Sequence, residues 1–248
     1  MGLGILLKRR RNMISVCMSV YNGERYLSEQ LDSILQQLGE DDEIIISDDG
    51  STDASLAIIS NYQDSRIRCY HNPQKGVISS FENAINKATQ PIIFLCDQDD
   101  IWYPNKVEIV LDYFGENPDK DIILSDLTII DNQQRVLFDS FHEQRRSKEG
   151  FWENVKRNSY IGCAMAFRSS IKTEILPFPK KIPMHDMWIG LIGEYHQTIL
   201  RIPEKLVYYR RHDNNVSELR TTTSFIKKMT WRVNLLWELF KRLILKNS

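Results

Sequence analysis

The chain has 248 residues, of which 42% are hydrophobic and 26% charged, and its net charge is -1. This length suits one α/β domain with an appendage, and the balance of residue types excludes a largely disordered or collagen-like protein. The four cysteines lie far apart without a C-x-x-C pair, which disfavours a zinc site or a disulfide framework and suits a reducing compartment. They are Cys17, Cys69, Cys96 and Cys163.

Charge is distributed unevenly along the chain. Residues 1–11 carry four basic side chains and no acid, and residues 222–248 carry six basic side chains and one acid, so residues 12–221 are acidic. An acidic body argues against nucleic acid as a partner, whereas basic ends suit anionic lipid headgroups. No apolar run reaches the roughly 20 residues of a transmembrane helix, and the first residues lack a secretory signal pattern. We therefore expect a cytoplasmic protein, with peripheral contact at the inner face of the cytoplasmic membrane.

The first half of the chain alternates strand-like and helix-like patterns. Strands are predicted at 14–20, 43–47, 66–70 and 91–96, and helices at 25–38, from near Asp53, and at 77–88. The apolar residues between Leu27 and Leu38 recur on one helical face, which should cover a sheet. Continuous apolar strands of this kind are typical of a parallel sheet buried on both faces. Such sheets bind ligands at the carboxyl ends of their strands.

The second half is less regular, and we interpret it as the acceptor side. Strands are predicted at 121–130, 135–141, 163–168, 197–202 and 205–210, and helices at 151–157 and 186–195. The highly charged segment 141–150 is predicted to be a mobile loop. A last helix at 222–245 has an apolar stripe from Phe225 to Ile244 with basic residues beside it. Such a helix either docks on the domain or lies on a membrane surface.

Two acidic residues, Asp48 and Asp49, follow the predicted strand at 43–47 and precede a Gly-Ser-Thr turn. Asp53 is placed to cap the next helix, and a capped turn is one interpretation of the whole segment. Adjacent carboxylates at the carboxyl end of a strand are not needed for capping, so they favour a polar ligand such as a base or ribose.

A second acidic turn, with Asp97, Asp99 and Asp100, follows the predicted strand at 91–96. Three close carboxylates repel one another, and Mn²⁺ or Mg²⁺ would offset the repulsion because these ions take carboxylate and phosphate oxygens. The alternative is a solvated acidic turn before a helix that begins near Pro104. Two acidic turns after two parallel strands favour one shared nucleotide and metal site.

Three segments, CMSVYNG, ISDDGSTD and FLCDQDDIWYPNK, resemble in order and spacing the inverting glycosyltransferases of family two. MHDMWIG and LVYYRRHDNNVS are similar to later elements of that family, and the combination is similar to a bacterial rhamnosyltransferase-like subgroup. The resemblance covers about residues 13–217. It implies a GT-A fold, in which a Rossmann-like, mainly parallel nucleotide-binding sheet is flanked by helices and joined by a smaller acceptor-side region.

The resemblance also implies roles for side chains in the first half of the chain. Ser19, Tyr21 and Asp49 would hold the nucleoside, with Tyr21 stacked on the base. Asp97 and Asp99 would match the family's donor and metal contacts, with Asp99 as the direct ligand of Mn²⁺ or Mg²⁺. Among their neighbours, Asp100 would be a supporting contact, and Gln98 departs from the all-acidic versions of the motif without removing these ligands.

In the second half, Asp186 would match the catalytic base, which accepts the proton of the acceptor hydroxyl while the metal stabilises the departing diphosphate. His185 stands where many relatives have Glu, and it would orient Asp186 or contact the acceptor. Without the resemblance, these two residues would be interpreted as a helix N-terminal pair. His212 would contact the diphosphate or complete the metal shell, and Arg210 or Arg211 would add positive charge.

The resulting prediction is an inverting glycosyltransferase that moves a sugar from a nucleotide diphosphate donor, dTDP-rhamnose or a UDP-sugar, to a glycan or lipid-linked acceptor in bacterial surface polysaccharide synthesis. One alternative is a nucleotidyltransferase, which the lack of a Gly-rich phosphate loop followed by Lys disfavours. The other is a noncatalytic membrane-associated scaffold, which the intact carboxylates disfavour. The predicted division is a basic segment at 1–12, a GT-A domain at 13–221 with a donor half (13–105) and an acceptor half (106–221), and an amphipathic helix at 222–248.

Overall fold

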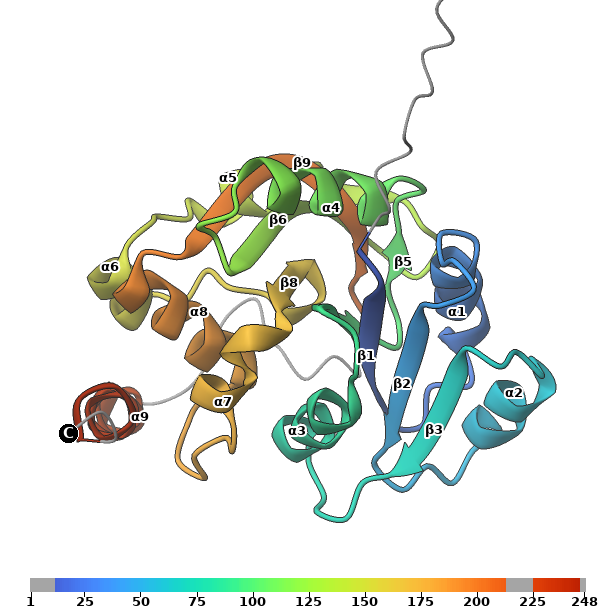
Figure 1. Ribbon diagram of the computed structural model, residues 1–248, viewed down its shortest axis with the longest axis horizontal. Coiled ribbons are helices and arrows are strands. Elements are labelled where there is room, and N and C mark those ends of the chain that lie inside the picture. The colour runs from blue at the N-terminus through green and yellow to red at the C-terminus, as the bar shows by residue number, and fades with distance from the viewer. Residues whose placement is uncertain (1–11, 213–224, 246–248) are drawn as a thin grey trace, which may run out of the picture.

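The structure is a computed structural model that describes residues 12–212 and 225–245. The basic cluster at 1–11, the segment 213–224 and the last three residues lie outside this description, and so do the predictions that fall on them. Within the described residues, one mixed sheet has the strand order β3-β2-β1-β4-β8-β6-β9-β5, and β7 pairs with β6. Figure 1 shows this sheet curling through the whole domain, with helices on both of its faces.

The first half forms the predicted parallel sheet. Its elements are β1 (Ile14–Val20), α1 (Leu27–Leu35), β2 (Glu43–Asp48), α2 (Ser55–Asn61), β3 (Ile67–His71), α3 (Val77–Lys87) and β4 (Ile92–Asp97). β1 pairs in parallel with both β2 and β4, and β2 with β3. In Figure 1, α1 and α2 lie to one side of these strands and α3 lies to the other. Leu27, Leu31 and Ile34 of α1 are fully buried, which confirms the predicted apolar face.

The second half extends the same sheet. Its elements are β5 (Ile101–Trp102), α4 (Lys106–Glu116), β6 (Ile122–Ile130), β7 (Val136–Phe138), α5 (Phe141–Arg145), α6 (Phe151–Lys156), β8 (Met165–Arg168), α7 (Lys172–Ile175), α8 (His185–His196), β9 (Ile199–Arg210), α9 (Phe225–Phe240) and a π-helical turn (Lys241–Leu245). β8 is antiparallel to its neighbours β4 and β6, whereas β6 and β9 are parallel. This confirms an α/β fold with a mainly parallel sheet.

Two predictions about the second half are wrong in detail. The segment 141–150 is not only a loop, because α5 occupies its first five residues, and Ser140 caps this helix by accepting the N–H of Glu143 at 3.0 Å. The strands predicted at 197–202 and 205–210 are one strand, β9. Its pairing with β6 shifts register between Leu124 and Asp126, an irregularity that lets Pro203 sit within the strand although proline has no N–H to donate.

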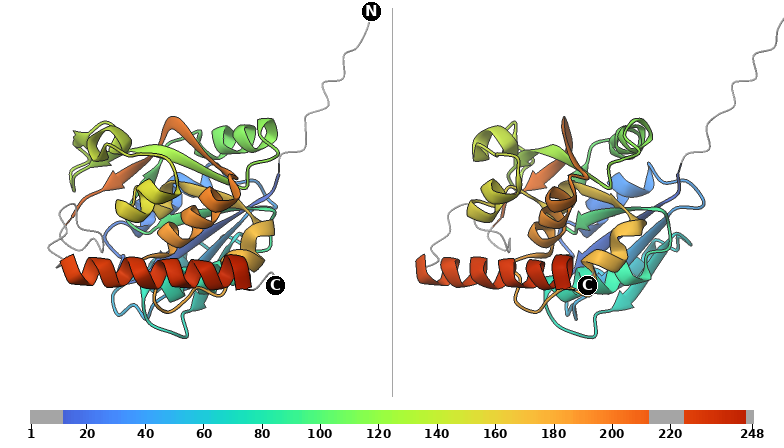
Figure 2. Two further views of the ribbon diagram at one scale, coloured as in Figure 1. Left: turned by 90° about the vertical axis from the view of Figure 1, so that its left-hand side faces the viewer. Right: turned by 60° about the vertical axis from the view of Figure 1, so that its left-hand side comes forward.

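Helix α9 docks on the domain through one of its faces. Leu235, Leu239 and Leu243 are buried, and Arg232 and Arg242 donate hydrogen bonds to backbone carbonyls of the domain, including Val155 O at 3.1 Å and Leu176 O at 2.9 Å. Figure 2 shows the helix lying across the outside of the domain. In the part of the chain that the structure describes, no helix is both long enough and apolar enough to cross a membrane.

Candidate active site

The carboxyl ends of β1, β2 and β4 lie side by side at one edge of the sheet. Ser19 of β1 is in register with Asp97 of β4 on one side and with Ser47 of β2 on the other. Because these strands are parallel, the loops that follow them emerge at the same edge. The loops hold Tyr21 and Asp99 as well as the acidic turn after β2, so strand pairing gathers into one place side chains that are distant in sequence.

The turn after β2 is closed by its own carboxylates. Asp48 accepts the N–H of Gly50 at 3.1 Å and that of Ser51 at 3.2 Å. Asp53 accepts the N–H of Ser55 at 2.9 Å, at the first residue of α2. The capped-turn interpretation therefore describes Asp48, whose oxygens bind the turn's own backbone, and in part Asp53, whose Oδ2 also accepts the N–H of Glu24 in the loop after β1 at 2.9 Å.

Asp49 has different partners. Its carboxylate accepts the N–H of Gly76 at 2.9 Å and the side-chain amide of Asn72 at 2.7 Å, both in the segment after β3. Tyr21, in the neighbouring loop, has 54% of its surface exposed. Two of the three residues predicted to hold a nucleoside, Tyr21 and Asp49, thus lie in adjacent loops at the sheet edge. Asn72 is a further polar residue of this edge that the predictions did not include, although its position directly after a third parallel strand was a usable signal.

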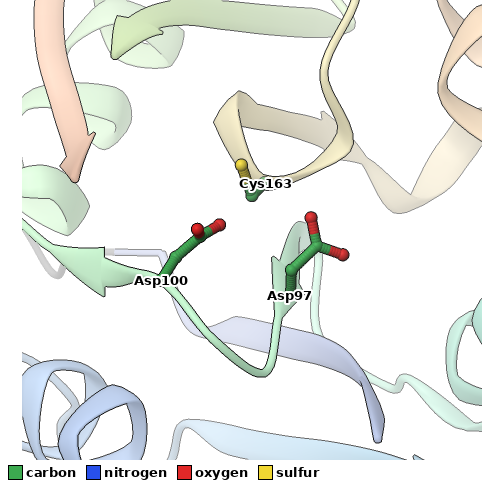
Figure 3. A group of neighbouring side chains, drawn as sticks. All are labelled: Asp97, Asp100 and Cys163. Atoms are coloured by element: carbon green, nitrogen blue, oxygen red, sulfur yellow. The ribbon is translucent and has the colours of Figure 1, made fainter. Parts of the chain in front are cut away.

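The loop after β4 forms a cluster with the segment before β8. Figure 3 shows Asp97 and Asp100 facing Cys163, and one possible ligand atom from each lies within 4.8 Å of the others. Asp100 is fully buried; its Oδ1 accepts the N–H of Arg210 at 3.0 Å, and its Oδ2 accepts no hydrogen bond from a nitrogen or oxygen donor among the described residues, with only the weakly donating thiol of Cys163 beside the carboxyl group. A buried carboxylate oxygen without a donor fits a cation that prefers oxygen ligands, as Mn²⁺ and Mg²⁺ do. Burial raises the pKa of the Cys163 thiol well above its usual range, which makes it the weaker ligand of the three.

Asp99, the predicted direct metal ligand, contacts His212. Asp99 Oδ2 lies 2.7 Å from His212 Nε2, and both side chains are largely buried. The imidazole stacks on the ring of Tyr26 with 5.0 Å between centroids. The structure therefore brings together a carboxylate and an imidazole that are both ordinary ligands of divalent metals.

Arg210 has a different environment from the one predicted. Its side chain is 2% exposed, its Nε donates to the backbone oxygen of Asp99 at 2.9 Å, and its guanidinium also pairs with Glu29 and lies over Tyr26. These contacts hold the acidic loop in place. The guanidinium of Arg210 therefore contacts other residues of the protein and does not have the predicted role of adding positive charge beside a diphosphate. For Arg211 this role remains a prediction.

Asp186 lies in the first turn of α8 and is 8% exposed. Burial raises the pKa of its carboxyl group to about 7, although backbone N–H groups of Met187 and Gly162 oppose the shift. Burial, followed by the charges of Asp99 and Asp186, also raises the pKa of Asp97. Asp186 thus lies close enough to the acidic loop for the carboxylates to repel one another. A carboxyl group that titrates near neutral pH is suited to take and release a proton.

His185 makes no hydrogen bond with Asp186. Its ring stacks on Phe81 with 4.0 Å between centroids, and neither ring nitrogen has a partner among the described residues. Gly162 leaves room for the imidazole, because a Cβ there would lie 2.9 Å from Nε2. His185 therefore does not orient Asp186 through a hydrogen bond, as one of the two predictions required. The other prediction, that His185 contacts the acceptor, remains a prediction.

Lys106 is a buried cation that the sequence analysis did not single out. It is 1% exposed, its Nζ donates to the backbone oxygen of Cys163 at 2.6 Å, and it lies 4.2 Å from the centroid of the Trp102 ring. Burial lowers its pKa to about 8, an effect that the charges of Asp100 and Asp97 oppose. The acidic loop therefore has a positive charge of the protein beside it.

Comparison with known proteins identifies the family. The family model for Glycosyl transferase family 2 matches residues 15–176, which include β1, both acidic turns and the acidic cluster. The chain belongs to glycosyl transferase family 2. An uncharacterized glycosyltransferase of Nostoc sp. is 28% identical over 212 residues, which cover 82% of this chain and 66% of the relative. The matched segment thus spans slightly less than two thirds of that relative's length.

Solved structures show the same fold for this glycosyltransferase. Residues 1-349 of TarS from S. aureus, in complex with UDP-GlcNAc, match with a TM-score of 0.66 and 16% identity over 92% of this chain and 73% of that TarS fragment. The mannosyltransferase PcManGT of Pyrobaculum calidifontis, in complex with GDP-Man and Mn²⁺, matches with a TM-score of 0.59 and 16% identity over 79% of this chain and 56% of that protein. The predicted GT-A, Rossmann-like fold is confirmed, and family membership sets the nucleotidyltransferase alternative aside.

Proposed function

We propose that this glycosyltransferase is an inverting, metal-dependent enzyme that transfers a sugar from a nucleotide diphosphate donor to a hydroxyl group of a glycan or lipid-linked acceptor. The observation that carries the proposal is the position of Asp186. It is a buried carboxyl group whose pKa is raised to about 7 by burial, and its charge raises the pKa of Asp97 at the end of β4. A proton acceptor beside an acidic, cation-binding loop is the arrangement that a single displacement requires.

The donor would bind across the carboxyl ends of β1, β2 and β4. Ser19, Tyr21 and Asp49 would hold the nucleoside. Because Tyr21 is exposed and Asp49 is anchored to the loop after β3, an aromatic face and a fixed carboxylate are both present at this edge. TarS binds UDP-GlcNAc and PcManGT binds GDP-Man, which supports a nucleotide-sugar donor here.

Mn²⁺ or Mg²⁺ would be held by Asp99, supported by the neighbours Asp97, Asp100 and His212. The residues fit such an ion, because Asp99 meets the imidazole of His212 at 2.7 Å and its charge also acts on the nearby carboxyl groups of Asp97 and Asp100. When bound, the cation would neutralise the negative charge that develops on the departing diphosphate. The Mn²⁺ in the complex of PcManGT supports this assignment.

In the proposed reaction, the acceptor oxygen forms a bond to the anomeric carbon as the bond from that carbon to the diphosphate oxygen breaks. The hydroxyl proton passes to the carboxylate of Asp186, and the nucleoside diphosphate leaves. One displacement inverts the anomeric centre, so no covalent sugar intermediate is required. Residues 13–105 would bind the donor, and residues 106–221, which include Asp186, would bind the acceptor.

We propose dTDP-rhamnose or a UDP-sugar as donor and bacterial surface polysaccharide as the product class. The test is a screen of nucleotide sugars for Mn²⁺-dependent hydrolysis, followed by transfer to candidate acceptors with the donor that is hydrolysed. Metal-dependent turnover of one donor supports the proposal. Binding of a nucleotide sugar with no turnover under any metal and acceptor condition would instead favour the noncatalytic scaffold.

We further propose that the enzyme works in the cytoplasm, in peripheral contact with an anionic membrane through α9. The face of α9 opposite its docked leucines is exposed and apolar, with Met229, Val233, Trp237 and Phe240 at helical spacing, and Ile244 continues it in the π-helical turn. The sequence from 222 to 248 has six basic residues and one acidic residue. An apolar face with aromatic residues and nearby basic charge is typical of helices that lie at a lipid surface.

A further inference from the structure

The side chain of Gln98 binds the backbone of Tyr21 from both of its amide atoms. Its Oε1 accepts the N–H of Tyr21 at 2.8 Å, and its Nε2 donates to the carbonyl of Tyr21 at 3.0 Å. This two-bond contact, the Gln98 clamp, imitates the pairing of two strands, although Gln98 lies in the loop after β4 and Tyr21 in the loop after β1. Gln98 stands between Asp97 and Asp99, so the clamp connects the acidic loop to the loop that carries an exposed aromatic ring.

Gly23 makes room for the clamp. A Cβ placed on Gly23 would lie 2.5 Å from Oε1 and 2.8 Å from the amide carbon of Gln98, which is closer than real Cβ contacts. These atoms are the far end of a flexible side chain. Adding a methyl group at this position would therefore displace Gln98 without requiring the backbone to move.

The loop after β1 is also bound to the turn after β2. The N–H of Asn22 donates to Ser51 Oγ at 3.0 Å, and Asn22 Oδ1 accepts the N–H of Thr52 at 2.8 Å. A continuous chain of hydrogen bonds thus runs from the turn that contains Asp49, through the loop at Tyr21, to the loop that contains Asp99. Contiguous networks of this kind carry energetic coupling when binding at one end orders the other.

We propose that Gln98 is a positioning residue that couples nucleoside binding to cation binding, so that occupation of either subsite strengthens the other. The inference rests on the proposed function for the identity of the two ligands. A cation that orders the acidic loop also fixes the backbone of Tyr21 through the clamp, and a nucleoside held at Tyr21 fixes Gln98 in return. Thermodynamic linkage requires the two effects to be equal.

The test uses a ligand pair that cannot touch directly. A nucleoside has no phosphate to bridge to the cation, so any coupling between a nucleoside and Mn²⁺ has to pass through the protein. The Mn²⁺ affinity is measured by water-proton relaxation with and without a saturating nucleoside, chosen from uridine, thymidine and guanosine as the one whose diphosphate the enzyme binds. In the wild-type protein we expect the nucleoside to raise the Mn²⁺ affinity by about 5-fold or more.

Two substitutions break the clamp from opposite sides. Gln98→Ala removes both hydrogen bonds, and Gly23→Ala displaces the side chain of Gln98 while leaving its chemistry intact. We expect each variant to bind Mn²⁺ alone and the nucleoside alone with nearly wild-type affinity. In both variants the Mn²⁺ affinity should be about the same with and without the nucleoside. Gln90→Ala is the matched control, because Gln90 also donates to a backbone oxygen (that of Asp41, at 3.0 Å) but lies before β4, at the opposite end of the strand. This control should keep the wild-type coupling.

The outcomes separate the inference from the proposed function. If no nucleoside diphosphate binds in the presence of Mn²⁺, the proposed function fails. If the ligands bind but the wild-type protein shows no coupling, or if Gln98→Ala and Gly23→Ala keep it, the role assigned to Gln98 is wrong while the proposed function stands. Loss of coupling in both variants, with the melting temperature and the separate affinities preserved, distinguishes positioning from a general loss of structure.

Discussion

His212 Nε2 lies 2.7 Å from Asp99 Oδ2, which joins the segment after β9 to the loop after β4. Both side chains are mostly buried, and Tyr26 stacks on the imidazole, so the pair has little freedom to separate. Because a carboxylate oxygen and an imidazole nitrogen are placed together, we expect substitution of either residue to affect the same bound cation.

Asp99→Ala should remove the effect of Mn²⁺ on nucleoside diphosphate affinity, because the cation is expected to bridge this carboxylate and the phosphates. We expect a loss of about 10-fold or more in affinity with Mn²⁺ present and little change without it. Titration calorimetry measures both. Asp119→Ala, which changes an exposed aspartate beside Lys120, is the control. Unchanged affinity in Asp99→Ala would move the metal site to the cluster of Asp97, Asp100 and Cys163.

His212→Ala should weaken Mn²⁺ binding by about 10-fold, since it removes either a ligand or the group that orients one. Electron paramagnetic resonance of free Mn²⁺ gives this affinity directly. His196→Ala is a matched control, because His196 also contacts a carboxylate, that of Glu174, at a more exposed position. Wild-type Mn²⁺ affinity in His212→Ala would show that the histidine only packs against Tyr26.

Asp186→Asn keeps the size of the side chain but removes its ability to accept a proton. Loss of a general base lowers the rate by roughly 10² to 10⁴-fold, and we expect sugar transfer to fall by about this factor. Donor and metal affinities should stay near wild type. Transfer at close to the normal rate, with chemistry shown to be rate-limiting, would exclude Asp186 as the base.

The pH dependence of transfer follows from the same residue. The proton acceptor has to be ionised, and burial raises the pKa of Asp186 to about 7, so the ionised fraction is small at pH 5 and nearly complete above pH 8. The value of kcat/KM for the donor, which reports ionisations of the enzyme before the donor binds, should therefore rise with pH and level off above about pH 8. The residual rate of Asp186→Asn should lack this rise, and an identical pH profile in the variant would assign it to another group.

Trp237→Glu should abolish binding to anionic vesicles with little effect on stability, because this side chain is 57% exposed on the undocked face of α9. Leu239→Ala changes the opposite face, where the side chain is 2% exposed, and should lower the melting temperature without removing the apolar surface. Sedimentation with vesicles of phosphatidylglycerol and of phosphatidylcholine measures binding, and salt should weaken it. Equal binding by Trp237→Glu and wild type would argue against membrane contact through this face.

The parts of the fold that the sequence predicts well are those in which the signal is local. The continuous apolar runs of β2 and β4 are stable only when they are buried on both faces of a sheet. The acidic residues that end these runs therefore lie at the edge of the sheet. Helix α5 was missed despite a local signal, since Ser140 and Glu143 have the spacing of a capping box.

Other features of the site depend on pairing between distant segments. Cys163 meets Asp97 and Asp100 only because β8 inserts between β4 and β6 as the antiparallel strand. Likewise, Gln98 and Tyr21 are neighbours because β1 and β4 are paired in register. The spacing of residues within a single segment does not show which distant strands will pair. The sequence therefore predicts which loops hold the functional residues, but not which of their side-chain atoms lie in contact.

The buried ammonium group of Lys106 would stabilise the acidic loop when the proposed cation is removed. Without a cation, carboxylates that lie this close repel one another, and the repulsion adds to burial in raising the pKa values of Asp97 and Asp100. Here a covalently attached positive charge remains beside Asp97 and Asp100 and is anchored to the carbonyl of Cys163. Treatment with a chelator should therefore yield an inactive but folded protein, and adding Mn²⁺ back should restore transfer without a refolding step.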